Sequence, residues 1–257
     1  MKIFVCVKHV PDTAATIKVA GDTGFEDADI KFIANPYDEF GIEEAVSIKE
    51  SQGGEVVIVT VGGESAPDTI RGALAMGADR AIHVEIDSQF LDAELTAQAL
   101  KAAIEADGAP ELIFTGKGSV DTESFQTPYR LARLFGMPVV NEVSALEVNG
   151  GKALATRESG AGEKQVLEMA LPCVVGATKG LNEPRYPKFP DIMKAKKKEI
   201  KAMGLSDLGV DESAAKVTLV KMEPVPERSQ ARMLEGSVDD QVTELIRVLK
   251  EDEKVLG

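Results

Sequence analysis

The chain has 257 residues, of which 44% are hydrophobic, and 43 acidic against 29 basic side chains give it a formal net charge of −14. This length permits one large domain or two small ones with an ordinary hydrophobic core. The negative charge argues against nucleic-acid binding and against broad binding to anionic membranes, because both need a positive protein surface. A site for a single phosphate stays open, since backbone N–H groups and one lysine can form it locally.

The opening residues, MKIFVCVKHV, place one lysine before a five-residue apolar run. That run is too short for a secretory signal peptide and predicts a first strand at residues 3–7. No apolar run is long enough for a transmembrane helix, which needs about 18 residues or more. The two cysteines, Cys6 and Cys173, are isolated in apolar runs, which favours buried reduced thiols in a cytoplasmic or mitochondrial-matrix-type compartment. His9 and His83 lack further ligands at a metal-type spacing, so no metal site is expected.

Short buried strands and helices alternate up to about residue 140. Asn35 is predicted to cap a helix that starts at Pro36, and Ser65 offers a capping box for a second helix. After the first strand, strands are predicted at residues 56–61, 81–84, 112–114 and 137–141, and helices at about 35–53, 65–77, 92–108 and 127–136. This order predicts an α/β fold with a doubly wound, mostly parallel, Rossmann-like sheet. Ligands bind such sheets at the carboxyl ends of the strands, so the loops after the first, second and fourth strands are candidate site walls.

The pattern changes after residue 140. Residues 145–148, 152–156 and 165–170 alternate apolar with polar side chains, and Asn149-Gly150 signals a hairpin turn. Two strands there are expected to pair antiparallel at the sheet's edge or beside it, and a buried strand follows at 173–176. The tail is extended at residues 217–226 and has a final helix predicted at 238–249. We therefore predict a nucleotide-binding α/β domain at residues 1–206 and, at 207–257, a C-terminal arm and helix that lie on a partner.

The loop at residues 115–130, TGKGSVDTESFQTPYR, is the strongest candidate binding site. It matches neither the G-x-x-x-x-G-K-[ST] nor the G-x-G-x-x-G phosphate-binding pattern. Its glycines, Gly116 and Gly118, permit a close backbone approach, and Lys117 supplies a positive charge. Thr127 is predicted to cap a helix that begins at Pro128 and whose positive end faces the loop. Hydroxyls that can donate to phosphate or ribose oxygens come from Ser119, Thr122, Ser124 and Thr127. A nucleotide-type ligand and an ordinary strand-to-helix turn are equally compatible with this pattern.

Three further segments also admit two interpretations. Residues 35–39 either begin a helix and nothing more or contribute to a site. Residues 181–190, LNEPRYPKFP, form a loop stiffened by three evenly spaced prolines, in which Phe189 either docks a partner or packs onto its own domain. The lysines of residues 194–201 either form a solvated helix face or steer an acidic partner.

Together, these motifs resemble the beta subunit of electron transfer flavoproteins. The resemblance rests on VKHVPD, on residues 34–39 with 43–46, on RGALAMGADR, on the loop at 115–130 and on residues 181–198. It runs from residue 3 to about residue 212 and is weaker in the tail. The implied sheet is of the adenine-nucleotide-binding type.

The resemblance implies an electron carrier subunit and not an enzyme. It implies a heterodimer whose alpha subunit holds most of the redox-active FAD, shared at the interface, while this subunit binds an AMP without a redox role. Electrons would pass from acyl-CoA dehydrogenases, in fatty acid oxidation, to a quinone-linked oxidoreductase. The absence of a general acid–base pair or nucleophile agrees with a protein that positions a cofactor and a partner.

The family's nucleotide contacts would fall on two single residues and two stretches of this chain. They are Cys6 and Val61, with Asn35, Pro36, Tyr37 and Asp38, and with Gly116, Lys117, Gly118, Ser119, Val120, Asp121, Thr122, Glu123, Ser124, Phe125, Gln126 and Thr127. The family's recognition loop, which docks acyl-CoA dehydrogenases, would fall on Arg185, Tyr186, Pro187, Lys188, Phe189, Pro190, Asp191, Ile192, Met193 and Lys194. Phe189 takes the apolar anchor position, where familiar members have leucine.

The chain also departs from the family pattern. Residues 116–121 are GKGSVD where many members have GKQAID, Phe125 replaces asparagine or alanine, Pro128 replaces glycine, and Thr13 replaces an aromatic residue near the flavin. The segment VPDT is shared with electron-bifurcating relatives, whose beta subunit carries a second, redox-active FAD in place of AMP. The loop lacks their DGDTAQ-type sequence, which favours AMP. A nucleotide-binding regulator or an adenylyl-transfer enzyme is the other alternative, although the chain has no HxGH or SGGxDS motif.

Overall fold

The structure is a computed structural model that describes residues 1–160, 162–226 and 231–256. The chain forms two compact units, Met1–Met222 and Glu223–Gly257. The first unit therefore ends later than the domain boundary predicted after residue 206.

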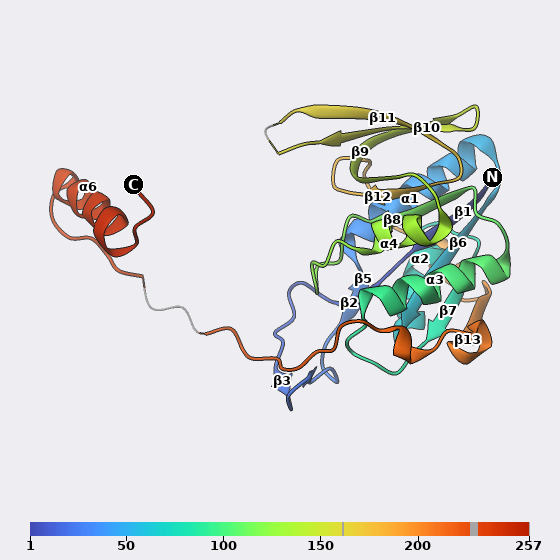
Figure 1. Cartoon of the computed structure of the whole chain (residues 1–257), viewed down its shortest axis with the longest axis horizontal. Coiled ribbons are helices and arrows are strands. Elements are labelled where there is room, and N and C mark those ends of the chain that lie inside the picture. Colours follow the sequence, from blue (N-terminus) through green and yellow to red (C-terminus); the bar gives the residue numbers. More distant parts are fainter. Residues whose placement is uncertain (161, 227–230, 257) are drawn as a thin grey trace. The chain divides into compact units, whose positions relative to one another are not determined.

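A nine-stranded sheet forms the centre of the first unit, in the order β11-β10-β9-β12-β8-β1-β6-β7-β13 (Figure 1). Seven neighbouring strands are parallel: β1 (Lys2–Cys6), β6 (Glu55–Gly62), β7 (Arg80–Glu85), β8 (Leu112–Gly116), β9 (Val139–Asn149), β12 (Cys173–Ala177) and β13 (Ile200–Gly204). At one edge, β10 (Lys152–Glu158) and β11 (Lys164–Ala170) continue the sheet antiparallel. The predicted doubly wound, mostly parallel sheet with an antiparallel addition is confirmed.

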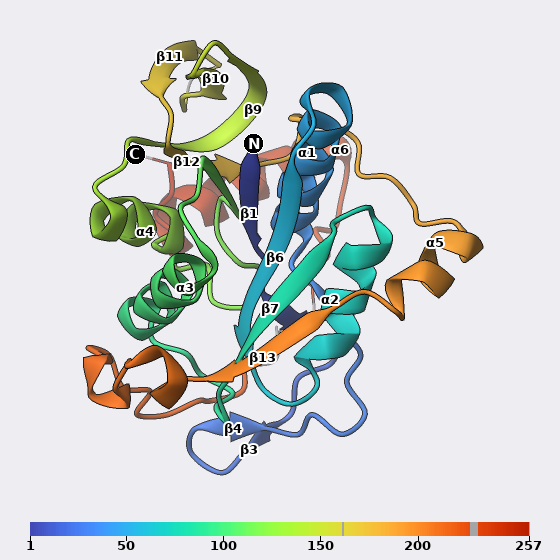
Figure 2. The same cartoon turned by 90° about the vertical axis from the view of Figure 1, so that its right-hand side faces the viewer.

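Helices cover both faces of the sheet (Figure 2). On one face lie α1 (Pro36–Gln52), α2 (Ala66–Ala75) and α5 (Phe189–Ala195), and on the other lie α3 (Ala93–Asp107) and α4 (Thr127–Phe135). Ile3 and Val5 of β1 belong to the core layer of the first face, whereas Phe4 and Cys6 belong to the second. Successive side chains of a strand point to opposite faces, so a strand covered on both sides needs a continuous apolar run.

Helix ends agree only partly with the predicted caps. Asp92 caps α3 by accepting hydrogen bonds from the N–H groups of Glu94 and Leu95. Ser65 makes no side-chain cap of α2, because its hydroxyl is 3.1 Å from the His9 ring instead. The predicted capping box is therefore wrong. Thr127 is the first residue of α4 and not its cap, which is Gln126.

Several strands differ from their predicted bounds. The segments predicted at 137–141 and 145–148 form one strand, β9, whose first part pairs with β12 and whose second part pairs with β10. It bends where Glu142 takes a left-handed backbone conformation, with a φ of 62°. The prediction missed β13 and the short pairs β2 (His9–Pro11) with β5 (Phe32–Ala34) and β3 (Val19–Ala20) with β4 (Gly24–Phe25). These strands are short or half-exposed and carry no buried apolar run.

The C-terminal segments form one main helix and several short turns. Two 3-10 turns, η1 (Ser206–Leu208) and η2 (Glu212–Ala214), belong to the first unit, and residues 215–226 carry no helix or strand. In the second unit, Ser237 and Asp240 form a capping box at the start of α6 (Val238–Arg247), and one wide turn, η3 (Val248–Asp252), follows. Within the described residues, every helix is too short or too polar to span a bilayer.

Candidate functional site

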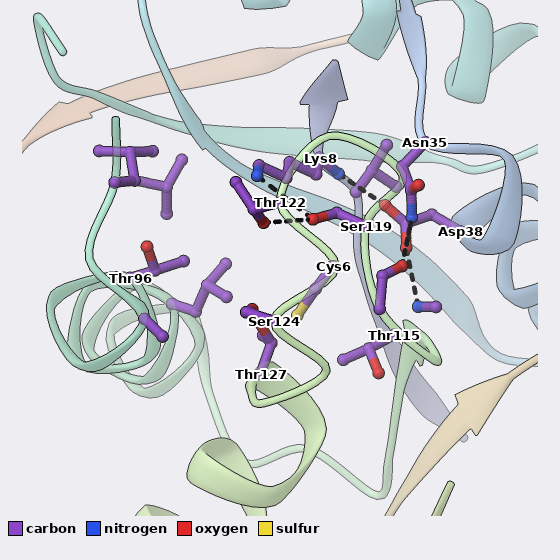
Figure 3. Close-up of a pocket in the computed structure, with 17 residues that line it drawn as sticks. Cys6, Lys8, Asn35, Asp38, Thr96, Thr115, Ser119, Thr122, Ser124 and Thr127 are labelled. Atoms are coloured by element: carbon purple, nitrogen blue, oxygen red, sulfur yellow. Dashed lines mark hydrogen bonds between the residues drawn. The ribbon is translucent and has the colours of Figure 1, made fainter. Parts of the chain in front are cut away.

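A cavity lies at the carboxyl ends of β1, β6 and β8 (Figure 3). Within the sheet, β6 is the neighbour of β1 in one direction and β8 is its neighbour in the other. The loops after β1 and β8 therefore diverge, and open α/β sheets bind ligands at such a switch point. Strand order alone thus positions this cavity as the candidate site.

Ten of the residues assigned by resemblance to nucleotide binding line the cavity. They are Cys6, Asn35, Asp38, Val61, Gly116, Gly118, Ser119, Thr122, Ser124 and Thr127. Eight others of that set do not line it: Pro36, Tyr37, Lys117, Val120, Asp121, Glu123, Phe125 and Gln126. The structure therefore brings together the small and hydroxyl-bearing members of the loop and leaves most of its larger side chains outside.

Seven lining residues are outside the set assigned by resemblance: Val7, Lys8, Leu91, Ala93, Thr96, Leu100 and Thr115. Lys8 and Thr115 carry a signal that sequence reasoning could have used, because each is a polar residue at the end of a buried strand run. The residues around the start of α3 carry no such signal, since their approach to the cavity depends on how α3 packs.

Hydroxyl groups surround the cavity. Figure 3 shows Thr96 extending from α3 on one side, with Ser119, Thr122 and Ser124 on the loop opposite and Thr127 at the start of α4. Thr115 is 3% exposed, and its Oγ1 has no hydrogen-bond partner within the described residues. A buried hydroxyl without a partner costs roughly 1–3 kcal/mol. A polar ligand in the cavity would remove that cost.

Asp38 joins three segments at the floor of the site. Its carboxylate accepts hydrogen bonds from the N–H groups of Lys8 (2.7 Å) and Gly116 (2.8 Å) and from the Asn35 side chain (2.9 Å). Burial raises the pKa of Asp38 to about 7, and these three N–H donors act in the opposite direction. A Cβ at Gly116 would lie 2.4 Å from the Asp38 carboxylate, so this contact requires glycine.

Asn35 fixes the middle of the loop. Its side-chain N–H donates to the carbonyl of Gly118 at 2.9 Å, and its side-chain oxygen accepts from the N–H of Val120 at 3.1 Å. Its amide is therefore engaged with the loop and makes no cap hydrogen bond at the start of α1. The predicted helix starts there, but the capping role assigned to Asn35 is wrong.

The cation of the cavity is Lys8, although sequence reasoning had considered Lys117. Within the described residues, Lys8 is the one lysine or arginine that lines the cavity. Its Nζ lies 2.6 Å from Asp121 Oδ2 and 3.3 Å from Ser119 Oγ. The Lys117 ammonium lies outside, 3.5 Å from Glu142 and 5.0 Å from the centre of the Tyr37 ring.

Phe125, one of the departures from the family pattern, packs against Gly118. A Cβ at Gly118 would lie 2.5 Å from Phe125 Cδ1, so the packing of this ring requires glycine. Phe125 itself has a left-handed φ of 52°, as does Glu123 at 47°. Such conformations are uncommon for residues other than glycine.

The proposed recognition segment is anchored to α1 at its base. The Arg185 guanidinium donates to both carboxylate oxygens of Glu43, at 2.8 and 2.9 Å, and to Glu50 at 2.6 and 3.0 Å. Arg185 therefore faces its own domain. Beyond it, Tyr186 and Phe189 are 96% and 74% exposed. Phe189 thus does not pack onto its own domain.

The lysine-rich segment is not a uniformly solvated face. The Lys198 ammonium donates to the carbonyls of Leu74 and Ala78, at 2.9 and 2.5 Å, so it caps the end of α2. Burial lowers the pKa of Lys198.

Among the described residues, no group of three or more histidine, cysteine, aspartate or glutamate side chains is arranged to hold a metal ion.

Comparison with known proteins gives one consistent match. The family described as "Electron transfer flavoprotein domain" matches residues 22–208. The chain is 39% identical over 261 residues to the electron transfer flavoprotein subunit beta of Bacillus subtilis, with 100% of each chain covered. It is 41% identical over 249 residues to the mitochondrial electron transfer flavoprotein subunit beta of Arabidopsis thaliana, covering 95% of this chain and 97% of the relative. It is 38% identical over 256 residues to the electron transfer flavoprotein subunit beta of Mus musculus, covering 98% and 97%.

Proposed function

The chain belongs to the electron transfer flavoprotein family, as a beta subunit, and from this premise we propose that it binds AMP in the cavity at the carboxyl ends of β1, β6 and β8. In this proposal it forms a heterodimer with an alpha subunit that holds most of the FAD. AMP has a structural role, and the subunit carries no catalytic residue of its own. When bound, FAD supplies the one-electron chemistry.

The unpaired Thr115 hydroxyl is the observation that carries the nucleotide proposal. It lies in a cavity that also offers one lysine and hydroxyls from both walls, and these groups suit a phosphate and a ribose. Val61, Leu91 and Leu100 add apolar surface for a flat base. A ligand with a base, a sugar and one anionic group therefore matches the lining.

The proposed electron route connects two partners through the heterodimer. Acyl-CoA dehydrogenases, in fatty acid oxidation, are the donors, and a quinone-linked oxidoreductase is the acceptor. The donor docks on the segment from Arg185 to Lys194, whose exposed Phe189 supports an apolar anchor there. The matching compartment is the bacterial cytoplasm or the mitochondrial matrix.

A second candidate function has one observation in its favour. A neighbouring cavity of about 580 Å³ shares Lys8, Val61, Leu91 and Thr122 with the first and is walled by Phe25, Phe32 and Phe90. A ligand longer than AMP could extend into it. This favours an electron-bifurcating subunit that holds a second FAD.

The nucleotides released from the purified heterodimer test these alternatives. We expect one AMP and one FAD per heterodimer, identified by chromatography and mass spectrometry after denaturation. Two FAD and no AMP would establish the bifurcating alternative instead. A cavity that releases neither AMP nor a second FAD would overturn the nucleotide proposal.

Two matched variants test the role of the Thr115 hydroxyl. Thr115→Val keeps the shape of the side chain and should weaken AMP binding about tenfold, the value of roughly one hydrogen bond. Thr60→Val is the control, because Thr60 Oγ1 is also buried with no partner in the described part of the chain but does not line the cavity. Equal AMP affinity in both variants, measured by calorimetry, would remove the support that Thr115 gives.

A further inference from the structure

An ion pair connects the loop after β8 to the residue segment that follows β1. Lys8 follows β1, and Asp121 lies on the loop after β8. The Lys8 ammonium contacts both carboxylate oxygens of Asp121, at 2.8 and 2.6 Å. The two side chains are 32% and 23% exposed, so water screens this pair only partly.

This ion pair uses the positive charge that an anionic ligand would need. Among the described cavity-lining residues, Lys8 is the one lysine or arginine. Asp38 of α1 is buried and accepts a hydrogen bond from the backbone N–H of Lys8, not from its ammonium. A phosphate on Lys8 would therefore meet the Asp121 carboxylate as a like charge, and the two anions cannot both take the same position on the ammonium.

The contacts of the loop allow the Asp121 carboxylate to move away from Lys8 while the loop backbone keeps its position. Asn35 binds Gly118 and Val120 independently of Lys8, so the residues before Asp121 remain attached. Asp121 also borders the neighbouring cavity of about 580 Å³, which gives its side chain space to turn into. Release of the carboxylate needs only a side-chain rotation next to a fixed backbone.

We propose that Asp121 is an intramolecular competitor of the ligand phosphate and that its exchange on Lys8 sets the affinity of the cavity for charged nucleotides. The inference rests on the proposed AMP site. A neutral nucleoside needs no exchange, whereas a nucleotide must displace the carboxylate. Asp121 thus determines specificity through Lys8 without contacting the base or the sugar.

The test compares AMP with adenosine on the nucleotide-depleted heterodimer. Asp121→Asn should raise the AMP affinity about threefold to tenfold, because freeing the ammonium and relieving like-charge repulsion act together. The affinity for adenosine should not change. Glu168→Gln also breaks an ion pair, with Lys152, but lies on β11 outside the cavity lining, and should change neither affinity. Lys8→Met should weaken AMP binding and spare adenosine.

Each other outcome overturns the inference in a recognisable way. Unchanged or weaker AMP binding in Asp121→Asn, with binding intact in the wild type, means that Asp121 orders the loop or has no role. Equal gains for AMP and adenosine mean that the variant merely opens the loop. A wild-type heterodimer that binds no added AMP defeats the proposed function first, and the competitor role of Asp121 with it.

Discussion

Asn35 and Asp38 hold backbone segments in place with groups that also face the cavity. Asp38 receives N–H groups from the ends of β1 and β8, and Asn35 bonds to both sides of Ser119 on the loop. Buried polar groups are stabilising only when such partners are present. Replacing either side chain is therefore expected to move the loop as well as to remove a possible ligand contact.

Gly118 and Phe125 should be energetically coupled. Gly118→Ala places a Cβ against the Phe125 ring, and overpacking of this kind costs roughly 1–3 kcal/mol. We expect a lower unfolding midpoint and weaker AMP binding, because the displaced ring shifts the loop. Adding Phe125→Ala should restore most of both losses, as measured by a double-mutant cycle of thermal unfolding and calorimetry.

A glycine without neighbours supplies the control for this cycle. Gly72 lies in α2, and apart from its chain neighbours and the nearby backbone of its own helix, no described residue comes within 4 Å of its would-be Cβ. Gly72→Ala should stabilise the protein by roughly 0.5–1 kcal/mol, as alanine does in a helix. If Gly118→Ala raises the unfolding midpoint as Gly72→Ala does, the packing of Phe125 on Gly118 does not contribute to stability.

At the scale of elements, α5 is held from two sides. Arg185, just before it, is bound by two glutamates of α1. At its other end, the Arg71 guanidinium of α2 donates to the carbonyls of Ala195 and Lys198, at 2.7 and 2.6 Å. The motif RGALAMGADR thus connects to the recognition segment through Arg71. This anchoring presents Phe189 on a short helix that is already ordered before a partner binds, which lowers the entropic cost of binding.

Phe189→Ala should slow electron transfer from an acyl-CoA dehydrogenase without destabilising the fold. The side chain is 74% exposed, so its loss leaves no core cavity. An aromatic anchor contributes roughly 2 kcal/mol or more to an interface, which predicts a rate constant about thirtyfold lower at limiting protein concentration. Stopped-flow reduction kinetics and the unfolding midpoint are the measurements.

Tyr186→Ala is the matched comparison for the anchor. Tyr186 is an aromatic residue on the same segment and is even more exposed, at 96%. We expect a much smaller effect, since it lies outside α5. Similar slowing in both variants would assign the docking energy to the whole segment, and normal rates in Phe189→Ala would exclude it as the anchor.

The predictability of these elements follows the strength of their local signals. The parallel core strands β1, β6, β7 and β8 were predicted because neighbouring residues such as Ile3 and Phe4 continue an apolar run through both faces. The half-exposed β13 was missed because its pairing with β7 depends on packing across the sheet. The same limit applies at the site. The glycines and hydroxyls of the loop are visible in the sequence, whereas the turn of Lys117 away from the cavity toward Tyr37 depends on tertiary contacts.

For the whole molecule, the two units differ in how they bury apolar surface. The first has core layers on both faces of its sheet. In the second, Val238, Val242, Leu245 and Ile246 of α6 are all exposed, at spacings that place them on one side of the helix. An amphipathic helix with this face uncovered is stabilised mainly by packing against another surface. We infer that the alpha subunit supplies it.

Leu245→Asp should therefore disrupt assembly while leaving the first unit folded. Placing a carboxylate on the apolar side of α6 removes buried area and adds a desolvation cost, so we expect the affinity for the alpha subunit to fall at least about tenfold. Thr243→Asp adds the same charge two residues away, at an exposed position off the apolar side, and should assemble normally. Co-expression followed by light scattering on a size-exclusion column measures both. Because the charge change is identical, a difference between the variants reports the face of the helix and not its net charge. Full assembly of Leu245→Asp would show that α6 packs elsewhere.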